Sequence, residues 1–85
     1  MNMEKRDTFQ TSDLPLATFL YAKGVLLKHI ISSPNDNRRK VFVFIEPPPE
    51  LISEFQSAQA EINVLAFKNA QNTLKGLIRE SEGRR

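Results

Sequence analysis

The sequence predicts an α+β fold, in which a helix, an antiparallel β-hairpin and two further helices follow one another along the chain. Three observations support this prediction. Two runs of β-favouring residues are separated by a polar loop, which is typical of a hairpin. The prolines Pro47–Pro49 end the second run abruptly, because proline cannot donate a hydrogen bond to a sheet. Apolar residues on both sides of the hairpin recur at helical spacing.

The length and composition indicate one small globular domain. The chain has 85 residues, of which 40% are hydrophobic and 26% charged, and such values exclude a disordered chain. We expect the domain to span residues 8–80, with flexible termini at 1–7 and 81–85.

The cysteine count and the apolar runs exclude several classes of protein. Cysteine is absent, which excludes disulfides, thiolate metal sites and a cysteine nucleophile. No apolar run is long enough to span a bilayer, and Met1–Gln10 lacks the apolar stretch of a signal peptide. We therefore expect a cytoplasmic protein with no membrane partner.

The first elements are a short edge strand over Thr8–Thr11 and a helix that follows it. Either Ser12 or Asp13 can accept backbone N–H bonds at the helix start, and Pro15 is tolerated in the first turn. Gly24 ends the helix, since glycine adopts the left-handed conformation at low cost.

The predicted hairpin consists of strands Val25–Ser32 and Lys40–Glu46, joined by a loop rich in turn residues. Both faces of its second strand are apolar: Val41, Val43 and Ile45 lie on one face, and Phe42 and Phe44 on the other. A half-buried strand would alternate apolar with polar residues. Either helices cover both sides of the hairpin, or one side contacts a partner.

Two helices, Leu51–Gln59 and Val64–Arg79, complete the predicted fold. Glu50 suits the positive end of the first of them, and Asn63 is a plausible N-cap of the second. We expect the core to contain twelve apolar side chains: Leu16, Phe19, Leu20, Val25, Leu27, Val41, Val43, Ile45, Phe55, Phe67, Leu74 and Leu77.

Residues able to do catalysis are sparse. His29 is the only histidine, and with no cysteine it cannot build a zinc site of recognised spacing. The acids Glu46, Glu50 and Glu54 lie where a strand stops and a helix begins, positions that need no catalytic explanation. A triad through His29 stays open in principle, but no motif supports one. We predict a non-enzymatic protein with no cofactor and no metal.

The charges are unevenly distributed. Residues 14–40 carry a net charge of +4, residues 41–66 of −4, and residues 67–85 of +3. Such runs are usually solvated faces, although basic flanks that meet in space would form a basic patch. The candidate nucleic-acid contacts are Arg38, Arg39, Lys40, Lys68, Lys75 and Arg79, since arginine and lysine bind phosphates. Basic residues at strand ends also protect against aggregation.

A strand followed by two helices resembles a ribbon-helix-helix DNA-binding unit. Two features count against that family here. Phe42 and Phe44 occupy the face that would read DNA, and the strand already has an intramolecular partner in Val25–Ser32.

The segment Phe9–Ala17, with Leu20, Lys23-Gly24, Val41–Phe44, Phe67, Ala70 and Leu74, carries a family resemblance. Over Phe9–Arg79 the chain resembles a family of short uncharacterised domains from bacteria, archaea and their phages. The resemblance implies a phage or mobile-element setting, in which small proteins often bind nucleic acid or protein, and it implies no activity.

Two hypotheses follow for the function. In the first, the chain is a small binding module whose six basic residues contact nucleic acid. In the alternative, it binds a protein partner or a second copy of itself through the apolar hairpin face around Phe42 and Phe44.

Overall fold

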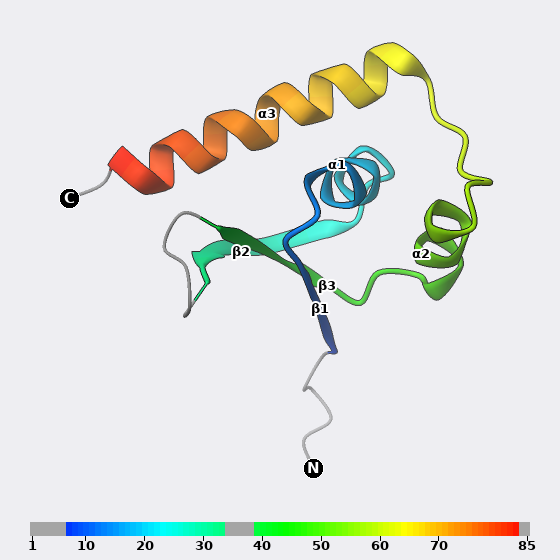
Figure 1. Cartoon of the computed structure of the whole chain (residues 1–85), viewed down its shortest axis with the longest axis horizontal. Coiled ribbons are helices and arrows are strands. Elements are labelled where there is room, and N and C mark those ends of the chain that lie inside the picture. The colour runs from blue at the N-terminus through cyan, green and yellow to red at the C-terminus, as the bar shows by residue number, and fades with distance from the viewer. Residues whose placement is uncertain (1–6, 34–38, 84–85) are drawn as a thin grey trace.

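The computed structural model describes residues 7–33 and 39–83. Its elements are β1 (Thr8–Thr11), α1 (Leu14–Ala22), β2 (Leu26–Ser32), β3 (Lys40–Ile45), α2 (Pro49–Gln56) and α3 (Val64–Gly83) (Figure 1). The predicted α+β class and element order are confirmed, and so is the short strand before the first helix. Most of the termini predicted to be flexible, 1–6 and 84–85, lie outside the described residues.

Helix α1 has the ends that the sequence predicts. The carboxylate of Asp13 accepts a hydrogen bond from the backbone N–H of Leu16 at 3.3 Å. Gly24 follows the helix with φ of +92°. The N–H of Val25 donates to the carbonyl of Leu20 at 3.0 Å, and that of Gly24 to Tyr21 at 3.1 Å. This pair of bonds is a Schellman motif, which satisfies the last carbonyls of the helix.

The last two helices differ from the predicted ranges. Helix α2 starts at Pro49 and ends at Gln56, where Leu51–Gln59 was expected. A second Schellman motif stops it early, with Ala58 in the left-handed position at φ +64° and the Gln59 N–H donating to Glu54 at 2.8 Å. An alanine gives no sequence signal for this conformation. Helix α3 continues to Gly83, beyond the expected end at Arg79.

The sheet is antiparallel and has the strand order β1-β3-β2. Phe9 of β1 lies opposite Phe44, and Leu27 of β2 lies opposite the same residue. The pairing of β2 with β3 shifts register between Leu27 and His29, so Lys28 is the extra residue of a β-bulge. Because of the bulge, His29 faces the same side as Leu26 rather than the opposite side.

Helix α1 lies at the centre of the molecule, between the sheet and α3 (Figure 1). Its five consecutive residues 16–20 are all buried, and at 100° per residue they point in every direction around the helix axis. The sheet contacts it through Phe42 and Phe44, and α3 through Leu74. The rings of Phe19 and Phe55, on α1 and α2, have centroids 5.5 Å apart.

Thr18 is the polar member of this buried segment. Its hydroxyl is fully buried and donates to the carbonyl of Leu14 at 2.7 Å. Because the hydroxyl has a partner inside its own helix, its burial costs little.

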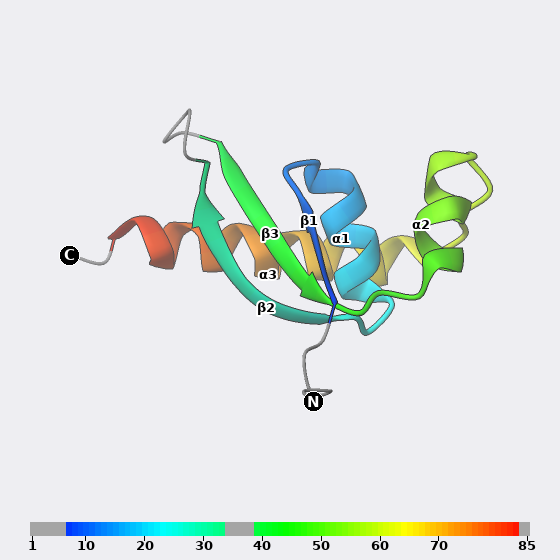
Figure 2. The same ribbon diagram turned by 90° about the horizontal axis from the view of Figure 1, so that it is seen from below.

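Helices α1 and α3 lie on the same side of the sheet. Figure 2 shows the sheet from its other side, with both helices behind it. Among the described residues, no helix lies on the near side in this view. The sheet therefore has one face covered by helices and one open face.

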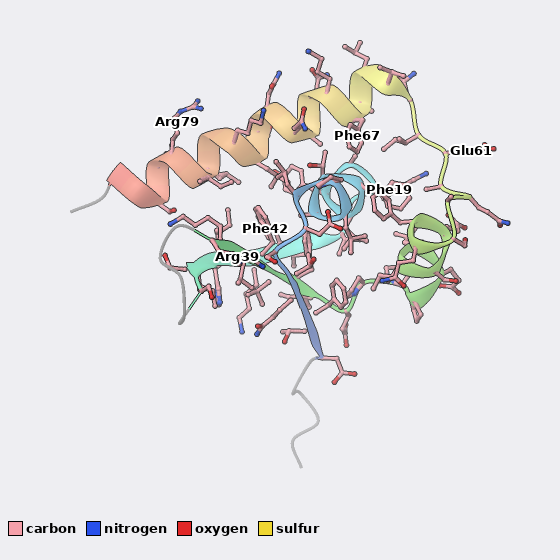
Figure 3. All side chains as sticks on the ribbon, in the orientation of Figure 1. Phe19, Arg39, Phe42, Glu61, Phe67 and Arg79 are labelled. Atoms are coloured by element: carbon pink, nitrogen blue, oxygen red, sulfur yellow. The ribbon has the colours of Figure 1, made fainter. Side chains whose placement is uncertain are left out.

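The expected assignment of the two faces of β3 is wrong. Phe42 and Phe44, expected to face a partner, are 2% and 0% exposed and belong to the central core cluster. Phe42 is labelled in Figure 3. Val41 and Ile45, expected in the core, are only half-buried. Covering one face with helices favours placing the larger phenylalanines there, because they remove more apolar surface from water.

The other predicted core residues lie in or against the helix-covered core, with one exception. Leu16, Phe19, Leu20 and Leu74 are buried, while Val25, Leu27, Phe55, Phe67 and Leu77 are half-buried against them. Val43 is buried but lies on the open face.

The attachment of α3 can be tested with two leucines of the same helix. Leu74 is fully buried and Leu65 is 65% exposed. We expect Leu74→Ala to lower the free energy of unfolding by about 2–5 kcal/mol, because it leaves a cavity between α3 and α1. Leu65→Ala should change it by less than about 0.5 kcal/mol. Urea unfolding followed by circular dichroism measures both, and equal effects would contradict this packing.

Candidate functional site

The open face of the sheet is the first candidate surface. Cross-strand pairing arranges it in three rows: Thr8, Ile45 and Leu26; Gln10, Val43 and His29; and Val41 with Ile31. The middle row has a valine between two polar side chains, and the cross-strand distance lets those side chains cover it. This explains why Val43 is only 3% exposed although no helix lies over it.

The β2 side of this face is its exposed apolar part. Leu26 is 59% exposed and Ile31 is 39% exposed. They lie beside Ile45 and Val41 of the central strand, respectively. We call these four residues the open-face cluster. It has apolar groups at both ends and the His29–Val43 pair between them.

A groove separates β2 from the C-terminal half of α3. It has a volume of about 500 Å³ and is lined by Leu27, Lys28, His29, Ile30, Leu77, Glu80 and Ser81. A neighbouring hollow of about 480 Å³ shares Leu27 and Leu77 and continues toward Tyr21 and Val25. The apolar side chains of β2 and α3 form the walls of the first groove, and Lys28, His29 and Glu80 add charged and polar groups to it. We call this space the β2–α3 groove.

The predicted basic residues fall into two groups. Lys68, Lys75 and Arg79 are exposed on α3, and their spacing places them within about 40° on one flank, over about 16 Å of helix. Figure 3 shows Arg79 pointing away from the sheet. The helical spacing therefore places these three cations in one row along α3, and we call this row the α3 stripe.

The second basic group lies at the start of β3. The Arg39 guanidinium donates to the Ser12 hydroxyl at 3.3 Å, and the Lys40 ammonium donates to the Ser32 hydroxyl at 3.2 Å. Arg38 lies outside the described residues. Arg39 and Arg79 do not point toward one another (Figure 3), so the structure does not bring the two groups into one compact patch.

The acidic residues of the middle segment are also exposed. Glu46, Glu50, Glu54 and Glu61 belong to the connection from β3 through α2 to α3. Figure 3 places Glu61 at the end of the molecule opposite Arg79. The acids of the middle segment thus gather on the connection from β3 to α3, while the α3 stripe runs from the start of α3 toward its C-terminal turns.

Catalytic geometry is not apparent around His29. This side chain is exposed and lines the β2–α3 groove with Glu80 and Ser81. The Ser81 hydroxyl, however, donates to the carbonyl of Ile78 at 3.0 Å, so its hydrogen is not directed at a base. Within residues 7–33 and 39–83, no group of three or more histidines and acids could hold a metal ion. No helix in the same ranges is long and apolar enough to cross a membrane.

Sequence reasoning missed Leu26, Ile31 and the groove. A weak signal existed in the run Leu26–Ile31, because the adjacent polar residues Lys28 and His29 break its alternation. Such an interruption is what a bulge produces.

The comparison with protein families confirms the resemblance. The family described as domain of unknown function DUF5659 matches residues 6–80. No curated protein and no solved structure matches the chain. Because the match covers most of its length, the chain belongs to this family.

Two neighbouring isoleucines test the assignment of the sheet faces. Ile30 packs against the helix-covered core, whereas Ile31 lies on the open face. We expect Ile30→Asn to lower the free energy of unfolding by about 1–3 kcal/mol, because the amide lacks a partner there. Ile31→Asn should stay within about 0.5 kcal/mol of the parent. Thermal unfolding of both variants gives the answer, and the opposite ranking would reverse the face assignment.

Proposed function

We propose that this member of the DUF5659 family is a small non-enzymatic binding module that contacts a protein through the open face of its sheet. The exposed leucine and isoleucine of the open-face cluster carry the proposal. Leu26 at 59% and Ile31 at 39% exposure lie on one face with half-buried Val41 and Ile45. Exposed apolar groups gathered on one face of a small protein typically mark an interaction site.

The chemistry of this face favours a protein partner with an apolar contact surface. Its three rows contain aliphatic side chains, Thr8, Gln10 and His29, and no lysine, arginine or acid. The face also lacks aromatic rings, on which nucleic-acid bases stack. Phe9, Phe42 and Phe44 all face the helix side.

A second candidate function, nucleic-acid binding, is supported by the α3 stripe. Three cations aligned over about 16 Å can contact successive phosphates of a backbone. Arg39 and Lys40 would extend the contact if the ligand also reached the start of β3. This version keeps the phage or mobile-element setting and the cytoplasmic location as part of the proposal.

The protein-binding proposal is tested by co-purification from the native host. We expect Ile31→Lys to lose, by about tenfold or more, a partner that is retained by the parent chain, since a charge enters an apolar contact. Leu65→Lys is the matched control, because Leu65 is an exposed apolar residue on α3. Quantitative mass spectrometry of cross-linked samples measures the ratio. Equal recovery by all three proteins would overturn the proposal.

The nucleic-acid candidate is tested by fluorescence anisotropy with labelled duplex DNA and single-stranded RNA at low and physiological salt. We expect micromolar binding that weakens steeply with salt, because binding to phosphates releases counterions. Lys68→Glu combined with Lys75→Glu should reduce the affinity about tenfold or more. Lys23→Glu, at the C-cap of α1, is the control of equal charge change per site. Absence of binding at low salt would discard this candidate.

A further inference from the structure

We propose that this chain forms a dimer in which the free edge of its β2 strand pairs with the β2 strand of a second copy. The added strand lies beneath the C-terminal turns of α3. The inference rests on the proposed function, because it takes Leu26 and Ile31 as contact residues, and it adds the identity of one partner. The result is a two-fold dimer with a continuous antiparallel sheet. Its open-face clusters would then lie side by side.

The free edge of β2 is the first observation behind this proposal. β2 is an edge strand, since the sheet order is β1-β3-β2. It has seven residues, Leu26–Ser32, without proline. Such an edge presents backbone N–H and C=O groups that another strand can pair with.

The position of α3 provides space for an added strand. In Figures 1 and 2 the C-terminal turns of α3 extend past β2, beyond the edge of the sheet. Leu77, Glu80 and Ser81 of these turns line the β2–α3 groove together with β2. A strand added to β2 would therefore be covered on its helix side by α3, as β2 itself is. The groove of about 500 Å³ would receive its inward-facing side chains.

The sequence of β2 matches itself in one antiparallel register. Pairing Leu26 with Ile31 of the partner subunit joins two open-face residues. The same register joins Leu27 with Ile30 of the partner subunit, and both of these residues face the helix side. In a regular strand residues separated by an odd number of positions face opposite sides, and here the bulge at Lys28 removes that conflict. A two-fold interface requires this self-complementarity.

The charges of the groove also suit a second copy. Lys28 lines the strand wall and Glu80 the helix wall. A strand with several acids would meet Glu80, and a strand with several cations would meet Lys28. The β2 strand of a second copy brings mainly apolar residues to the groove, because the proposed register pairs Lys28 with His29 of the partner subunit, on the open face.

The test is sedimentation velocity of the full chain over roughly 1 to 200 μM, a range suited to micromolar dimers. We expect the mass to rise with concentration from 9.7 kDa toward twice that value. Leu26→Lys and Ile31→Glu should each weaken the dimer about tenfold or more, because each places a charge against an apolar residue. Leu65→Lys, on the first turn of α3, should leave the dimer unchanged.

The double variant Leu26→Lys with Ile31→Glu identifies the register. In the proposed dimer the introduced lysine of one copy faces the introduced glutamate of the other, so dimerisation should recover. Within one chain the two positions lie opposite Ile45 and Val41, about 13 Å apart along the strand, so they cannot compensate for each other in the monomer. Recovery therefore supports pairing of the two β2 strands.

Two results would overturn the inference. A mass that stays at 9.7 kDa at every concentration would mean that the bulge and Lys28 protect the edge against pairing, as such features do in other sheets. A dimer that both single variants weaken and the double variant does not restore would mean that the open faces stack instead. If the chain stays monomeric but the Ile31→Lys variant still loses a host partner, the dimer inference fails and the proposed protein-binding function stands. The failure of the inference is therefore distinguishable from the failure of the proposed function.

Discussion

The burial of α1 on all sides is the constraint on which the rest of the structure depends. Its residues 16–20 leave no direction around the helix free for solvent. The sheet, α2 and α3 must therefore each supply apolar groups to it, which they do through Phe42 and Phe44, Phe55 and Leu74, respectively. A chain of 85 residues has a limited apolar surface with which to build a core. With α1 and α3 on one side of the sheet and α2 packed beside it against α1, the described residues include no helix to cover the other side.

The elements could be predicted from the sequence because strong local signals mark most of their ends. Helix α1 begins after Asp13 and ends before Gly24, and both ends are set by hydrogen bonds that involve only neighbouring residues. Pro47 and Pro48 separate β3 from α2, which begins at Pro49, in the same local way. The end of α2 was missed because its Schellman motif uses Ala58, and only the surrounding structure makes an alanine adopt that conformation.

The candidate site was less predictable because it depends on tertiary arrangement. Every residue from Val41 to Ile45 is apolar, so the pattern of β3 alone could not decide which face meets the helices. The volume of the phenylalanines determines which face of β3 meets the helices. On the neighbouring strand, the bulge at Lys28 turns Ile31 to the open face. The α3 stripe was predictable, since it follows helical geometry. Its separation from Arg39 and Lys40 was not, because that depends on how α3 packs across α1.

The two edges of the sheet differ in a way that points to β2 as the side for association. β1 has four residues, and three of them are polar, which are the features of a protected edge. β2 has seven residues, of which four are leucine or isoleucine. Two of these four, Leu27 and Ile30, pack against the core, whereas Leu26 and Ile31 are exposed. Exposed apolar groups on the outer edge strand of a sheet carry a risk of aggregation. Their presence on β2, under turns of α3 that extend past the sheet, is accounted for if another strand is bound there.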